Sequence, residues 1–87
     1  MSGNEEVFTR LREVVRRTFA AANRVEIERS TTSADIDGWD SLSHSILIMN
    51  VEDAFGVDLP LDAVYSLVDL GALADLIESA LSNTGSK

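Results

Sequence analysis

Three residues whose types could do chemistry lie close together near the middle of the chain: Asp40, Ser41 and, one helical turn later, His44. An acid, a hydroxyl and an imidazole are the residue types of a hydrolytic triad. A triad needs the base within hydrogen-bond reach of the nucleophile and the acid behind the base. Asp40 adjoins Ser41 in sequence and cannot readily lie behind His44. The spacing therefore argues against catalysis, and we predict that the protein is not an enzyme and has no catalytic residues.

A helix is predicted from Ser41 to Ala54, directly after a Gly38-Trp39 turn. Asp40 is a favourable N-cap, because its carboxylate can accept the unpaired amide hydrogens of the first turn. Ser41 then lies in that turn, where the N–H groups and the positive end of the helix dipole favour an anion such as phosphate. The predicted helix therefore tolerates a phosphoryl group on Ser41.

The chain resembles the acyl carrier proteins in two stretches, WDSL at residues 39–42 and EDAFGV at residues 52–57. The resemblance covers about residues 6–81. It implies an all-α fold, a small four-helix bundle with a long loop between the first two helices and a short third helix. It also implies that a phosphopantetheinyl transferase transfers 4'-phosphopantetheine from coenzyme A to Ser41, and that acyl cargo is then carried as a thioester.

The resemblance also implies partners: the transferase, and acyl-transferring, ligating or condensing enzymes. The residues expected to contact them are an apolar set and an acidic set around the second helix, namely Asp40, Leu42, Ile46, Met49, Glu52, Asp53 and Asp58. Asp40 would also help to bind the transferase or its metal ion. The best-known fatty-acid carriers have an acid near the position of Ile46, so this chain departs from them in a feature that bears on docking to fatty-acid enzymes.

Several alternative functions remain compatible with the same residues. A peptidyl or aminoacyl carrier is less favoured, because such carriers commonly have Gly or His where this chain has Asp40. An acidic helical adaptor domain would keep Ser41 unmodified, and a minimal hydrolase would use Ser41 with His44. Otherwise, His44 is expected at the surface, shaping the surroundings of Ser41. The sequence specifies neither the cargo nor whether fatty-acid, polyketide or other lipid chemistry supplies it.

Length and composition limit the other function classes. The 87 residues are expected to form a single domain, 1–87, with flexible tails at 1–4 and 82–87. The absence of cysteine and the single histidine argue against a metal site. No apolar run approaches the roughly 18 residues of a membrane span, and no secretory leader is recognisable. We therefore expect a cytoplasmic monomer without a membrane partner.

Charge is unevenly distributed along the chain. Residues 1–29 hold six Arg and five acids, whereas residues 30–87 hold ten acids and a single Lys. The second part, with a net charge of −9, should repel nucleic acid and attract basic protein surfaces. No aromatic residues are interleaved with the arginines of the first part, so no nucleic-acid partner is expected.

Apolar spacing of three and four residues predicts a first helix from Glu5 to Ala22. A long connection, 23–39, should follow, pinned by apolar side chains. Residues 61–67 are predicted to form the short third helix, and Ser66 or Asp69 to cap the fourth. The expected pins are Val25, Ile27 and Ile36. The expected core residues of the second helix are Leu42, Leu47, Val51, Ala54 and Phe55, and those of the third are Leu61, Val64 and Tyr65.

Overall fold

The structure is a computed structural model that describes residues 3–85, and within that range all regular secondary structure is helical. The α-helices are α1 (Gly3–Thr18), α2 (Ser41–Phe55), α3 (Leu61–Val64) and α4 (Leu70–Gly85). Two short 3-10 helices, η1 (Ala20–Arg24) and η2 (Ser33–Asp35), lie in the connection between α1 and α2. The predicted all-α bundle, with a long connection after the first helix and a short third helix, is confirmed. None of the helices in this range is long and apolar enough to cross a membrane.

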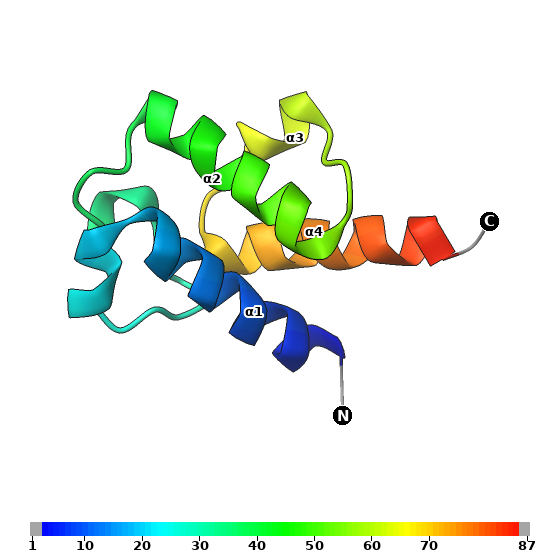
Figure 1. The fold of residues 1–87 in the computed structure, drawn as a ribbon, viewed down its shortest axis with the longest axis horizontal. Coiled ribbons are helices and arrows are strands. Elements are labelled where there is room, and N and C mark those ends of the chain that lie inside the picture. Colours follow the sequence, from blue (N-terminus) through cyan, green and yellow to red (C-terminus); the bar gives the residue numbers. More distant parts are fainter. Residues whose placement is uncertain (1–2, 86–87) are drawn as a thin grey trace.

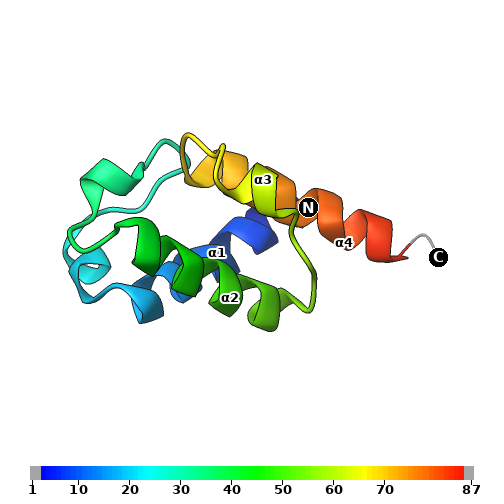
Figure 2. The ribbon, with the colours of Figure 1, turned by 90° about the horizontal axis from the view of Figure 1, so that it is seen from above.

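The helix α1 packs against both α2 and α4. It runs toward the end of the molecule that holds the connection 19–40, whereas α2 and α4 begin at that end and run away from it (Figure 1). Figure 2 shows the same arrangement from above, and α3 in it is a single turn of four residues. Ser41, the first residue of α2, therefore lies at the end of the bundle where the connection is folded.

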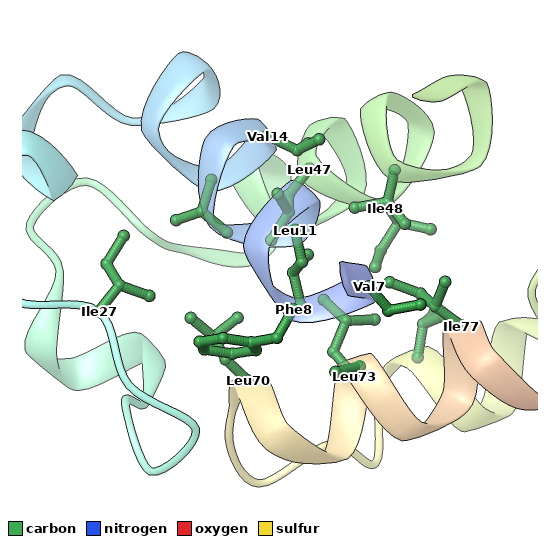
Figure 3. Close-up of a cluster of buried hydrophobic side chains, with 14 of the residues drawn as sticks. Val7, Phe8, Leu11, Val14, Ile27, Leu47, Ile48, Leu70, Leu73 and Ile77 are labelled. Carbon is green, nitrogen blue, oxygen red and sulfur yellow. The ribbon is translucent and has the colours of Figure 1, made fainter. Parts of the chain in front are cut away.

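The core is formed by the apolar face of α1 between those of α2 and α4 (Figure 3). Leu11 of α1, Leu47 of α2 and Leu73 of α4 are almost completely buried there. The face predicted for α1 from its spacing is confirmed, since its apolar residues are inside. These buried residues are Val7, Phe8, Leu11, Val14 and Val15.

Some predicted core residues are wrong. Leu42 is 73% exposed, because it is five positions from Leu47 and therefore about 140° away around α2, outside the face that meets α1. Ile48, which was not among the expected core residues of the second helix, is buried. Leu61 of α3 is 71% exposed, and Tyr65, directly after α3, is also exposed, since Leu59 and Val64 fill the inward positions around this single turn.

Helix ends also differ from the predictions. The first helix ends at Thr18 rather than Ala22, because Phe19 is extended (φ −122°, ψ 116°) and stacks on Trp39 with ring centroids 5.0 Å apart. A tertiary contact thus overrides the continuing helical pattern. At the termini, α1 already begins at Gly3 and α4 continues to Gly85, within the expected tails. Residues 1–2 and 86–87 of those tails lie outside the described residues.

The long connection is tied to the start of α4 by backbone hydrogen bonds. The N–H groups of Leu70 and Gly71, which have no partner within the helix, donate to the carbonyls of Thr31 (2.9 Å) and Arg29 (2.7 Å). A Cβ on Gly71 would lie 3.0 Å from the Arg29 carbonyl oxygen, so glycine permits this close approach. Two predicted pins, Ile27 and Ile36, are buried, and the third, Val25, is half-buried. The connection is therefore part of the packed structure.

Two leucines of α2 give a matched test of this packing. Leu47→Ala should lower the free energy of unfolding by about 2–5 kcal/mol, because it leaves a cavity in the core. Leu42→Ala should change it by no more than about 0.5 kcal/mol, because Leu42 is at the surface. Urea unfolding followed by circular dichroism measures both. Equal losses for the two variants would contradict the assignment of faces.

Candidate functional site

The site begins where the connection turns into α2. Gly38 adopts a positive φ of 91°, which favours glycine, and the turn leads through Trp39 to Asp40. Asp40 is the N-cap of α2: its Oδ1 accepts a hydrogen bond from the N–H of Ser43 at 2.9 Å. Hydrogen bonds from the backbone N–H and the hydroxyl of Ser43 hold the pKa of Asp40 below its usual value of 3.8. The predicted cap is therefore confirmed, and it fixes the first turn of the helix.

Ser41 is the first residue of α2, and it is exposed to solvent. Its position at the helix start places it beside amide hydrogens and the positive end of the helix dipole. A negatively charged phosphodiester on its hydroxyl fits this environment and has room at the surface. The site is thus sterically and electrostatically suited to a phosphate-linked group.

His44 does not lie at the surface as expected but is half-buried between aromatic rings. The indole N–H of Trp39 donates to His44 Nδ1 at 3.0 Å, and His44 Nε2 lies 2.7 Å from the carbonyl oxygen of Val64. Because a carbonyl only accepts, Nε2 must be the donor, and His44 is in its neutral Nε2–H form. Both ring nitrogens have partners, so neither is free to act as a base for Ser41. The geometry of a hydrolytic triad is absent.

A pocket of about 350 Å³ opens beside Ser41. Its lining comes from the starts of α2 and α4, the end of α3, the α3–α4 linker and the connection. Leu70 and Leu73 supply buried apolar surface, and Asp40 and Asp69 supply carboxylates. Asp69 also caps α4, since its Oδ1 accepts from the N–H of Ala72 at 2.9 Å. The pocket can hold a group attached at Ser41 whose chemistry is partly apolar.

The apolar residues predicted to contact partners lie together on α2. Leu42 (73% exposed), Ile46 (45%) and Met49 (65%) are spaced by four and three residues and so share one side of the helix. We call these three residues the α2 apolar row. It starts one residue after Ser41 and faces away from the core.

The acidic residues predicted for docking differ in their exposure to solvent. Asp53 and Asp58 are exposed. Glu52 is half-buried, and its Oε2 accepts a hydrogen bond from the N–H of Leu59 at 2.9 Å, so it holds the turn after α2 in place. Asp53 and Asp58 are therefore the more accessible of the three acids.

Sequence reasoning missed the contacts that cross between elements at this site. Neither the bond from His44 to Val64 nor the one between the hydroxyls of Ser45 and Tyr65 (2.8 Å) could be read from periodicity. The only available signal was chemical, since the indole N–H of a half-buried Trp39 needs an acceptor. Within residues 3–85 there is no group of three or more His, Cys, Asp or Glu that could hold a metal ion.

Comparison with known proteins gives a consistent result. The family described as "Phosphopantetheine attachment site" matches residues 9–77. Acyl carrier proteins of Renibacterium salmoninarum and of an Arthrobacter species are 37% and 36% identical over 81 residues, which cover 92% of this chain and 98% of each relative. The solution structure of the holo acyl carrier protein of Geobacter metallireducens has a TM-score of 0.82 at 31% identity and covers 92% of this chain and 91% of its own.

The fold and the site thus define a carrier, a protein that presents a covalently attached group. The chain belongs to the acyl carrier protein family. Its cofactor is a covalently attached phosphopantetheine, which supplies a thiol for thioester chemistry. Membership also implies interaction with a phosphopantetheinyl transferase and with enzymes that handle acyl groups.

The cap of α2 predicts a pH-dependent stability. Because the pKa of Asp40 is lowered on folding, its contribution is present above the usual value of 3.8 and is lost as the pH falls through the lower folded-state pKa. Asn is as good an N-cap as Asp, so Asp40→Asn removes the charge and keeps the cap. Wild type should have the higher urea midpoint at neutral pH, and the difference should shrink below pH 3.8 and vanish once the pH is below the lower folded-state pKa. A difference that persists at low pH would contradict this account.

Proposed function

We propose that Ser41 is the attachment point of the phosphopantetheine group. The observation that carries the proposal is an exposed serine hydroxyl in the first turn of α2, directly after the Asp40 cap. A phosphodiester there lies at the positive end of the helix dipole, which partly offsets the acidic surroundings. The match to the phosphopantetheine attachment family includes this position.

The cargo is an acyl group carried as a thioester on the thiol of the attached group. The protein binds and positions this cargo and leaves the chemistry to its partners, because both ring nitrogens of His44 are occupied. The pocket beside Ser41 offers buried apolar surface to part of the cargo. Acyl cargo is favoured over peptidyl cargo by the acyl carrier proteins among the relatives.

Partners dock on α2 beside Ser41. The α2 apolar row provides a contact surface with three large exposed side chains, and Asp53 and Asp58 add negative charge. Such a surface fits a partner with an apolar groove rimmed by basic residues. Burying the apolar row provides affinity, and the acids steer the encounter. The departure from an acid at Ile46 shifts the balance toward apolar contact.

The attachment can be tested by the intact mass after incubation with coenzyme A, Mg²⁺ and a promiscuous phosphopantetheinyl transferase. Wild type should gain a single phosphopantetheine adduct, whereas Ser41→Ala should gain none. Ser43→Ala is the matched control, since Ser43 lies two residues away on the same helix turn and should leave the adduct intact. An adduct on Ser41→Ala would place the attachment at another residue, and no adduct on folded wild type would favour an unmodified adaptor domain.

The charge of the docking surface can be tested in the same assay. Asp53→Asn should slow modification by severalfold at low ionic strength, because it removes a steering charge close to the α2 apolar row. Glu13→Gln makes the same change in net charge on the exposed face of α1 and should have a smaller effect. Raising the salt concentration should slow wild type and diminish the difference. Equal rates at low and high salt would contradict electrostatic steering.

A further inference from the structure

A row of aromatic rings crosses the molecule beside Ser41. Phe19 and Trp39 stack with ring centroids 5.0 Å apart, Trp39 and His44 stack at 5.9 Å, and His44 and Tyr65 lie tilted at 5.5 Å. The row runs from the buried Phe19 to the exposed Tyr65. It therefore joins the end of α1, the turn before α2, α2 itself and the end of α3.

His44 is the member of this row that also makes directional contacts on both sides. It accepts from the indole N–H of Trp39 and donates to the carbonyl of Val64. We call these two hydrogen bonds the His44 bridge. Only the neutral Nε2–H form can make both bonds. A protonated ring would direct an N–H from Nδ1 at the N–H of Trp39, so the bridge would break on that side.

The short helix α3 depends on contacts of this kind. It is a single turn of four residues, and the carbonyls at its end have no partners within the helix. Ser66 satisfies the carbonyl of Asp62 through its hydroxyl at 2.9 Å, and His44 satisfies that of Val64. The bond from His44 reaches across 20 positions of sequence and ties the end of α3 to α2.

We propose that His44 is a positioning residue whose bridge holds the end of α3 against α2 and so sets the shape of the pocket beside Ser41. The residues that the bridge joins, Trp39, His44 and Val64, all line that pocket, together with Tyr65. Release of the bridge frees this wall to move outward. The bridge then governs how far a group attached at Ser41 enters the pocket, a consequence that rests on the proposed function, whereas the bridge itself does not.

Protonation of the His44 ring provides a test of the bridge. His44 is the only histidine in the chain, and its neutral and protonated forms differ in whether Nδ1 can accept a hydrogen bond. The ionisable groups around the ring come from several elements: Asp40 before α2 and Asp69 before α4 line the same pocket, and Tyr65 after α3 lies against the ring. Charging the ring should therefore loosen the turn at Trp39 and the end of α3 together.

The first experiment is nitrogen-15 NMR on the unmodified wild-type chain. At about pH 7.5 the ring of His44 should show the Nε2–H form, with the indole N–H of Trp39 hydrogen-bonded. As the ring becomes protonated, amide hydrogen exchange in residues 61–68 should accelerate by about tenfold relative to that of α1, the effect of losing one hydrogen bond. Two results would overturn the proposal: a ring in the Nδ1–H form, or amide exchange rates in residues 61–68 that change by the same factor as those in α1.

Variants separate positioning from general stability. His44→Phe keeps an aromatic ring in the row and removes both hydrogen bonds, so residues 61–68 should exchange about tenfold faster at neutral pH without a step on acidification. Trp39→Phe is the matched variant that removes only the donor to Nδ1 and should weaken the step. Faster exchange across α1 and α4 as well would mean general destabilisation and would overturn the proposal. The titration of wild type decides the question if a variant does not fold.

A last measurement connects the bridge to cargo. Wild type and His44→Phe are loaded with the same saturated acyl-phosphopantetheine, and the cargo-dependent shifts of the Leu70 and Leu73 amides are compared. Larger shifts in the variant are expected, because the wall at α3 is released, and equal shifts would overturn the link to cargo. Failure of wild type to accept the group would count against the proposed function and would leave the NMR result on the unmodified chain intact.

Discussion

The amide hydrogens at the start of a helix have no partner within that helix, and in this protein their satisfaction organises the site. At α4, Leu70 and Gly71 donate to backbone carbonyls of residues 29–31, which ties the long connection to the bundle. At α2, the carboxylate of Asp40 accepts from the first turn. The connection is therefore held in its middle and at its end, and Ser41 lies where it enters α2. A serine in an untethered loop would have no defined position relative to the pocket.

This arrangement suits a protein that carries a covalently attached reactive group. The group supplies the thiol, and the chain supplies a fixed point of attachment, an adjacent pocket and a surface that partners can recognise. The imidazole of His44, which would be the natural base next to a serine, is used for structure through bonds to Trp39 and Val64. A thioester placed here is consequently kept apart from an internal base.

Much of the fold and part of the site could be predicted from the sequence. The face of α1 was readable because its apolar spacing has the helical period, and the start of α2 because a cap is a local interaction. Two other features could not be predicted in this way: the exposure of Leu42, and the end of α1 directly before Phe19. A position on a helix is buried only if another element packs there, and periodicity does not say which stripe of a largely apolar helix meets that element. Similarly, α1 ends before Phe19 because the ring of Phe19 stacks on that of Trp39, which is 20 residues away in the sequence.

The sequence by itself determined that a helix begins at Ser41, that Asp40 caps it, and that the second half of the chain is strongly acidic. These properties depend on neighbouring residues or on composition. Only the tertiary structure decided that Glu52 is engaged by Leu59, that Leu42, Ile46 and Met49 form an exposed row, and that both ring nitrogens of His44 have partners. The reason is physical: each of these depends on which distant group lies opposite a side chain. That is fixed by the packing of α1, α2, α3 and α4 and not by any local pattern.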